Sequence, residues 1–290
     1  MRDTYALLVL TASLASAPAG AEVVDIAPSS AWNVDFADDK CRLARLFGEG
    51  ENRHLVFFEQ YWPSEGFGLT VAGPSFDRFR SRRRTELSFF DGQDPQRTEP
   101  FTGKVAGFGP GVIYSSAALA PADEVSDEQG DDRTTRLSQL DPGLASKVAY
   151  VGIKQRGDEI RLLTGPLDEA FEVLNQCTAG LVAEWGLDFE RQRSASRMPE
   201  WTNMAAVVRR IQKDYPRTAL NRGEQGLMRM RVIVSPEGLV EECTIIKATD
   251  TEKLESPACD AMQDAKFTPA LDAAGQPMRS YYVTRITYQI

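Results

Sequence analysis

The chain has 290 residues, of which 42% are hydrophobic and 26% are charged, and its formal net charge at pH 7 is −9. This composition is typical of a globular protein and excludes an intrinsically disordered one, and the length suffices for two domains. Basic and acidic residues are equal in number from Met198 onward, and the acidic surplus lies before it. Neither half of the chain therefore has the basic surface that nucleic-acid binding requires, and we exclude nucleic acid as a partner.

Residues 1–21 are predicted to form a secretory signal peptide. Arg2 gives a weakly positive start, an apolar run follows, and Ala19-Gly20-Ala21 fits a small-x-small cleavage pattern. The apolar run is shorter than the roughly 20 residues that a membrane-spanning helix needs. We therefore expect a periplasmic protein whose mature chain begins at Glu22. If the signal stayed uncleaved, it would anchor the protein in the inner membrane.

Residues 22–188 are predicted to form a first domain, an antiparallel β-sheet followed by one packed helix. Residues 22–40 show no clear element and are interpreted as a lead-in. Strands are predicted at 41–47, 54–61, 67–72, 85–90, 111–119, 147–154 and 159–163, where alternating or aromatic-rich residues are mostly bounded by turn residues. The helix is predicted to begin near Pro166 with Thr164 as its cap, and its apolar stripe is Leu167, Phe171, Leu174, Thr178, Leu181 and Trp185.

Four cysteines, an even number, indicate two disulfides in an exported protein. They are Cys41, Cys177, Cys243 and Cys259. Among the three pairings, we favour Cys41–Cys177 with Cys243–Cys259, because each bridge then stays inside one predicted domain. A zinc site is disfavoured, since no two cysteines have C-x-x-C spacing and the chain has one histidine.

Two charged clusters lie in the first domain. The basic one consists of Arg78, Arg80, Arg82, Arg83 and Arg84. It fits either a solvated loop or a surface that contacts anionic lipid headgroups or an acidic partner. The acidic one, residues 123–132, lacks the residue order of a calcium-binding loop and is expected to be an acidic loop that pairs with the arginines.

We predict no catalytic residue, no metal and no cofactor. His54, the one histidine, lies inside a predicted strand, where a structural role is commoner than a catalytic one. The chain has no H-E-x-x-H, G-x-S-x-G or phosphate-binding G-x-x-x-x-G-K-[ST] motif. A hydrolase that uses paired carboxylates stays a minor hypothesis, because acids are plentiful but nothing singles out a pair.

Residues 189–199 are predicted to be a polar linker and residues 200–290 a second domain of the order helix, strand, strand, helix, strand. The first helix would carry the apolar stripe Trp201, Met204, Ala205, Val208 and Ile211. Strands are predicted at 228–234, 239–247 and 280–290, and Ser256 and Pro257 would begin the short second helix. The predicted fold class is thus α+β for the whole chain.

The second domain contains, in order, Tyr215-Pro216, the spaced residues Gly226, Val232, Val234 and Gly238, and Phe267-x-Pro269-Ala270. With these motifs it resembles the C-terminal domain of TonB, the periplasmic energy transducer of Gram-negative bacteria. The resemblance covers roughly residues 200–290. It implies a small sheet whose edge binds a segment of an outer-membrane receptor as an added strand. The implied partner-binding residues are Tyr215, Pro216, Tyr282, Val283, Thr284, Arg285, Ile286 and Thr287.

The sequence also departs from TonB, which has an uncleaved N-terminal helix and a long proline-rich spacer. A predicted disulfide-tied domain takes the place of that spacer. We therefore expect a TonB-like binding protein rather than a full transducer, with an envelope scaffolding protein as the alternative. Trp32, Cys41, Cys177 and the Trp185–Asp188 segment resemble an N-terminal domain of exported alphaproteobacterial proteins, and that resemblance implies no activity.

Overall fold

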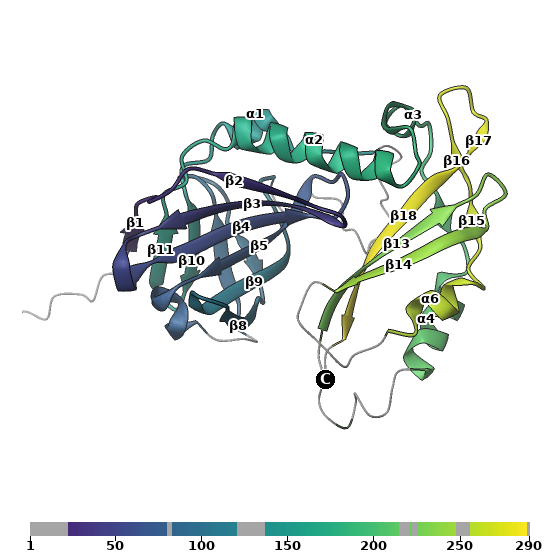
Figure 1. Cartoon of the computed structure of the whole chain (residues 1–290). Helices are drawn as coiled ribbons and strands as arrows, with labels where there is room; N and C mark the ends of the chain where they lie inside the picture. Colours follow the sequence, from purple (N-terminus) through teal and green to yellow (C-terminus); the bar gives the residue numbers. More distant parts are fainter. Residues whose placement is uncertain are drawn as a thin grey trace, which may run out of the picture.

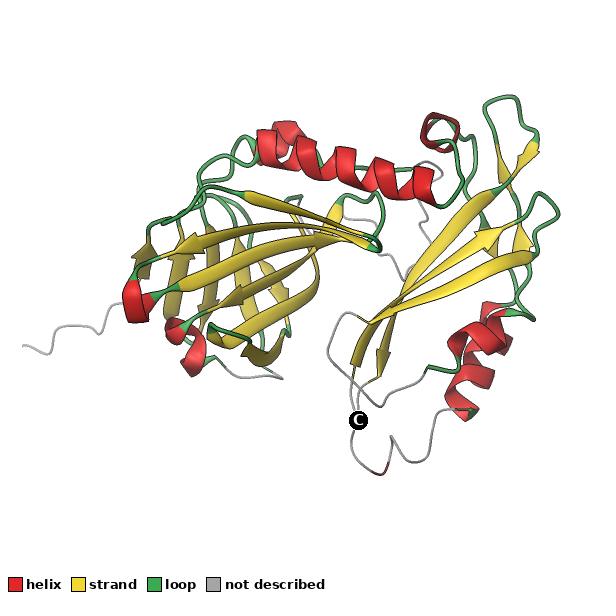
Figure 2. Cartoon of the chain, viewed as in Figure 1, coloured by secondary structure: helices red, strands yellow, loops and turns green. Residues whose placement is uncertain are grey.

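The computed structural model describes residues 23–79, 83–120, 137–214, 221, 226–247 and 256–288. Antiparallel sheets dominate these residues and helices are few, which confirms the α+β class (Figures 1 and 2). We call residues 23–188 the first domain and residues 200–288 the second domain. The predicted signal peptide and the acidic residues 123–132 lie outside the described residues.

The first domain contains two sheets. One has the order β2-β3-β4-β5-β9-β8 and the other the order β1-β11-β10-β6-β7. The strands are β1 Val23–Ile26, β2 Asn33–Ala37, β3 Lys40–Phe47, β4 His54–Gln60, β5 Gly66–Ala72, β6 Thr85–Ser88, β7 Gln96–Thr98, β8 Phe101–Val105, β9 Gly109–Ala118, β10 Val151–Gln155 and β11 Asp158–Leu162. Two 3₁₀ turns, η1 Gly50–Asn52 and η2 Pro74–Arg78, follow β3 and β5. The pair β1–β11 is parallel, and the other strand pairs of the two sheets are antiparallel.

Alternation in the sequence explains the first-domain core. Cys41, Leu43 and Phe47 project from one side of β3 and are fully buried, as the period of two predicts. Aromatic rings fill the space under the helix: Phe58 lies 5.0 Å from Phe67 and 5.5 Å from Phe171, centroid to centroid. The lead-in contains β1 and β2, which the sequence did not predict because both strands are short and mostly exposed.

Helix α2, Asp168–Glu184, crosses the first domain after the single-turn helix α1, Pro142–Ala145. It begins later than predicted, and Thr164 is not its cap. The reason is that Gly165 and Leu167 donate main-chain hydrogen bonds to Ala149 and Ala145, which hold this segment outside the helix. Asp168 and Glu169 then place negative charge in the first turn, where the helix dipole favours it.

The second domain follows the predicted order with additional short strands. Its elements are β12 Glu200–Trp201, α4 Met204–Lys213, β13 Gly226–Val234, β14 Val240–Lys247, α6 Ala258–Met262, β15 Phe267–Thr268, β16 Ala270–Leu271, β17 Pro277–Met278 and β18 Ser280–Tyr288. The predicted linker contains helix α3, Phe189–Arg193, and Arg197 forms a bridge with Leu271.

The apolar stripe predicted for α4 was partly wrong. Trp201 precedes the helix in β12, pairs with β15 and stacks on Phe267. Val207 and Ile211 are the buried residues of α4, whereas Met204 is exposed. Placing Trp201 in the strand shifts the start of the helix, so its buried face differs from the predicted one by part of a turn.

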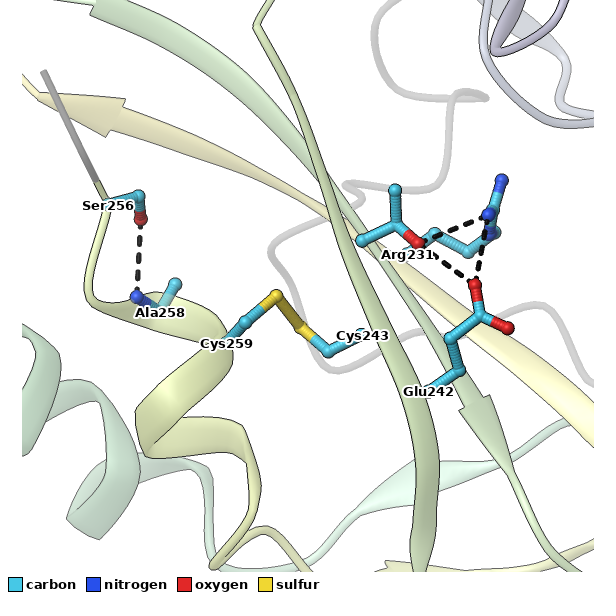
Figure 3. Close-up of a disulfide and its surroundings, with 7 residues drawn as sticks. Arg231, Glu242, Cys243, Ser256, Ala258 and Cys259 are labelled. Atoms are coloured by element: carbon cyan, nitrogen blue, oxygen red, sulfur yellow. Dashed lines mark hydrogen bonds and ion pairs between the residues drawn. A yellow bond between two sulfur atoms is a disulfide. The ribbon is translucent and has the colours of Figure 1, made fainter. Parts of the chain in front are cut away.

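Both favoured disulfides are present. Cys41–Cys177 joins β3 to α2, and Cys243–Cys259 joins β14 to α6 (Figure 3). Ser256 precedes α6 and its hydroxyl accepts a hydrogen bond from the Ala258 amide at 3.2 Å. Each bridge ties a helix to the sheet on which it packs, and each stays inside its own domain.

A candidate partner-binding edge

The candidate site is the outer edge of β18. The second-domain sheet has the order β14-β13-β18. Nine residues of β18 pair with nine of β13 in unbroken antiparallel register, from Ser280–Val234 to Tyr288–Gly226. Within the described residues, no strand pairs with the other side of β18. In an antiparallel edge strand, alternate main-chain N–H and C=O groups point away from the sheet, so this edge can take another strand.

Side chains of β18 alternate between two environments. Tyr282 and Ile286 pack on the core beneath α4 and α6, where Tyr282 meets Trp201 and Phe267. Val283 and Arg285 face the first domain. Thr284 is half-buried, and Thr287 pairs with Leu227 through its main chain. Tyr215 and Pro216, the remaining predicted partner-binding residues, lie outside the described part of the chain.

The opposite edge, β14, is less suited to strand addition. Its register with β13 shifts between Ile233 and Val234, and Glu241 and Glu242 are adjacent exposed carboxylates near its start. Register irregularities and charged side chains are features that protect sheet edges from further pairing. β18 pairs with β13 without a register shift, and its residues 280–284 carry no charged side chain. Arg285 is the one charged residue of this strand.

In the described part of the chain, both faces of this sheet pack against other elements, which the sequence did not predict. The face opposite α4 and α6 packs against the first domain through an apolar cluster formed by Tyr61, Trp62, Val182, Leu187, Ile233 and Tyr281 (Figure 1). Arg229 and Arg231 lie on this face and are only 4% and 8% exposed. Their alternation with Met228, Met230 and Val232 places them on the face opposite the core, but no local sequence pattern shows that this face is covered.

Aromatic rings of the first domain receive these buried arginines. The Arg229 guanidinium lies 5.2 Å from the Tyr61 ring centroid, and that of Arg231 lies 4.6 Å from Trp185. Arg231 also donates hydrogen bonds to Thr244 and, at 3.5 Å, to Glu242 (Figure 3). Burial raises the pKa of Tyr61, so its hydroxyl keeps its proton beside these cations. Cation–π contacts of this kind strengthen when water is excluded.

Polar contacts fix the start of β18 to the end of α2. Arg279 donates to the carbonyl oxygens of Trp185 and Gly186 at 3.2 and 3.1 Å. Gln192 donates to the Arg279 carbonyl oxygen and accepts a hydrogen bond from the Ser280 hydroxyl. Both Gln192 and Ser280 are buried. Arg279 thus ties the candidate edge to the end of α2, and Gln192 ties it to α3, the helix between the two domains.

A small cavity lies where the edge meets the first domain. Its lining includes Gln60, Tyr61, Ser115, Arg229 and Arg285, and its volume is about 20 Å³. That is room for a group the size of one or two water molecules. Sites for cofactors are usually more than ten times larger, so this cavity could hold only a small group.

The other predicted residues lie away from this edge. His54 is buried in β4, where it contacts the Asn52 carbonyl oxygen at 2.8 Å and accepts from the Ser75 amide. Arg78 pairs with Asp158 and Arg84 with Glu99, at 3.3 and 4.0 Å. Arg80 and Arg82 are outside the described residues, so the lipid contact stays a prediction. No described residues form a group of potential metal ligands.

Comparison with known families supports the resemblance found in the sequence. Residues 211–290 match the model of the Gram-negative bacterial TonB protein C-terminal family, which confirms the suspected relationship for this segment. The match includes β13, β14, α6 and β18. No curated protein matches the chain. Domains of this family are non-enzymatic, take part in transport and interact with other proteins. In the part of the chain that the structure describes, no helix has the length and apolar character needed to cross a membrane.

Proposed function

We propose that this is a periplasmic TonB-like protein that binds partner proteins by accepting a strand at the β18 edge. Outer-membrane TonB-dependent receptors are the proposed partners. The observation that carries the proposal is the edge of β18, which has unbroken register and meets no further strand among the described residues, within the segment that matches the TonB family. Main-chain hydrogen bonds of the added strand would supply affinity, and the side chains that alternate along β18 would select its sequence.

Packing against the first domain holds this edge in place. Because it covers one face of the sheet and α4 and α6 cover the other, an incoming chain can reach the sheet only along an edge. An edge held in place before binding loses less conformational entropy when a strand is added. We propose no energy transduction by this chain, since the proposal requires binding alone.

Proline substitutions test the edge. Successive residues of an edge strand point their N–H groups in opposite directions. One of the two substitutions Val283→Pro and Thr284→Pro therefore removes an N–H group that points outward from the edge. The other removes an N–H group that donates a hydrogen bond to β13. The variant that loses the bond to β13 should have the lower melting temperature, which tells the two variants apart. The variant that stays folded should lose the capture of outer-membrane receptors from detergent-solubilised Gram-negative envelopes, identified by mass spectrometry.

The same design on β14 provides the control. Thr244→Pro and Ile245→Pro are compared in the same way, and the one that stays folded is used. It should still capture receptors, because β14 is not the proposed receiving strand. If both folded variants capture receptors as the wild type does, strand addition at β18 is wrong. If the wild-type protein captures no receptor but binds peptidoglycan or lipid vesicles, the scaffolding alternative replaces this proposal.

A further inference from the structure

The two disulfides differ in how far they are exposed to solvent. Cys41 and Cys177 are 0% and 6% exposed and belong to the apolar core beneath α2. Cys243 and Cys259 are each partly exposed. The rate at which a thiolate attacks a disulfide depends on its access to the sulfur, and a buried group reacts only when the structure around it opens. A thiol in solution should therefore reach Cys243–Cys259 in the folded protein, and Cys41–Cys177 only after the core opens.

The Cys243–Cys259 bridge links the start of α6 covalently to the sheet (Figure 3). Helix α6 has five residues, which is too short to be stable without tertiary contacts. Beyond its other end, Asn203 donates to the Asp264 carbonyl oxygen and accepts from the Lys266 amide, both at 2.9 Å. Breaking the bridge should therefore free the start of α6 from β14, while these hydrogen bonds hold the segment that follows the helix.

A row of paired residues leads from the bridge to the edge strand β18. Cys243 is the register partner of Val232 in β13, and Val232 is the partner of Tyr282 in β18. All three pack on the core beneath α4 and α6. The Tyr282 ring also meets that of Phe267 at 5.3 Å, and Phe267 follows α6 in the chain. A displacement of α6 should therefore loosen the packing of Tyr282, and with it β18.

We propose that Cys243–Cys259 is a thiol–disulfide exchange site, and that its reduction by a dithiol frees α6 and loosens β18 while Cys41–Cys177 stays intact. The proposed reductant belongs to the chemical class of protein dithiols, such as the paired cysteines of thiol–disulfide oxidoreductases. This inference does not depend on whether β18 receives a partner strand.

The exchange has two steps. One thiolate of the dithiol attacks a bridge sulfur and forms a mixed disulfide with it, and the other bridge cysteine leaves as a thiolate. The second thiol of the reductant then displaces the first cysteine. Two electrons and two protons pass to Cys243 and Cys259, and the dithiol becomes a disulfide.

Limited reduction of the full-length oxidised protein with dithiothreitol tests the exchange site. Samples are quenched with iodoacetamide and digested, and mass spectrometry measures alkylation at each cysteine. Cys243 and Cys259 should be alkylated at least about tenfold faster than Cys41 and Cys177, because the buried bridge reacts only through an opening of the core. Equal rates, faster alkylation of Cys41 and Cys177, or no alkylation of Cys243 and Cys259 in the folded protein would overturn the inference.

Hydrogen–deuterium exchange of the selectively reduced protein tests the effect on β18. Exchange should become faster in residues 258–262 and 280–288 and stay unchanged in residues 40–47. Restoring the bridge with oxidised glutathione should restore protection. Unchanged exchange in residues 280–288 would contradict the loosening of β18. A comparable loss of protection in residues 240–247 would show that the whole domain needs the bridge to fold, and would also overturn the inference.

The matched control is the Cys243→Ser/Cys259→Ser variant, which keeps the buried bridge. Without any reductant it should exchange as the reduced protein does in residues 258–262 and 280–288. Neither dithiothreitol nor oxidised glutathione should change its exchange further. A response of this variant to dithiothreitol would assign the effect to Cys41–Cys177 and overturn the inference.

Discussion

His54, the residue considered as a catalytic candidate in the sequence, has a structural role. Its two ring nitrogens contact the Asn52 carbonyl oxygen and the Ser75 amide, so the neutral ring with hydrogen on Nδ1 satisfies both neighbours. It thereby links η1 to η2. Burial lowers the pKa of His54, and the Asn52 contact opposes this in part.

This pKa shift predicts a pH dependence of stability. Because the pKa is lowered in the folded protein, the unfolded chain binds the proton more readily, and protonation favours unfolding. Stability should therefore fall as the pH drops below about 6.5, the ordinary value for histidine. Urea unfolding at pH 7.5 and 5.5 checks this, with His54→Gln as the control. A variant that loses as much stability over this interval as the wild type would exclude His54 as the cause.

Gly73 is predicted to be intolerant of a side chain. Its φ is +148°, and a Cβ at this position would lie 2.1 Å from Cδ2 of His54. Gly73→Ala should destabilise the protein by about 2–4 kcal/mol through this clash. Gly92 also has positive φ but open space around it, so Gly92→Ala should cost about 1 kcal/mol. Equal losses in denaturant titrations would contradict the clash.

At the scale of elements, the two disulfides should contribute unequally to stability. They close loops with sequence separations of 136 and 16 residues. By the chain-entropy relation, the Cys41→Ser/Cys177→Ser variant should lose about 5 kcal/mol and the Cys243→Ser/Cys259→Ser variant about 3 kcal/mol. Denaturant unfolding of both variants without reductant measures the difference. A larger loss for the shorter loop would show that local strain or packing outweighs loop entropy.

Elements with strong periodicity could be predicted from the sequence, and those defined by their neighbours could not. The strand at Cys41–Phe47 and the stripe of α2 follow from alternation and helical spacing, because each buries one face. Short β1 and β2 carry little such signal. The edge at Tyr282–Ile286 came from a family resemblance, whereas the burial of Arg229 depends on Tyr61, a residue far away in the sequence, and no local pattern shows it.

At the scale of the whole molecule, the covered sheet face joins the two domains into one unit. Tyr281 is 4% exposed and its ring meets Trp185 edge-on at 5.1 Å. Tyr281→Ala should cost about 3 kcal/mol or more and uncouple the domains, giving two calorimetric transitions where the wild type gives one. Tyr282→Ala, which empties the opposite face, should destabilise the second domain alone. Two transitions in the wild type would contradict the coupling.

The covered face also limits where a partner can bind. With the first domain on one side and α4 and α6 on the other, the sheet offers its edges, and β18 is the edge with regular register. A strand added there would extend the sheet without displacing either domain. In the proposed function, the edge of this TonB-like sheet is left for binding, while the face opposite α4 and α6 is used for packing.

Hydrogen–deuterium exchange of the full-length protein, with and without a receptor captured from envelope extracts, tests strand addition most directly. Main-chain amides of an edge strand that gains a partner become protected. The account predicts new protection within residues 280–288 and unchanged exchange in residues 240–247. Protection of the β14 residues, or of the first domain alone, with β18 unchanged would contradict it.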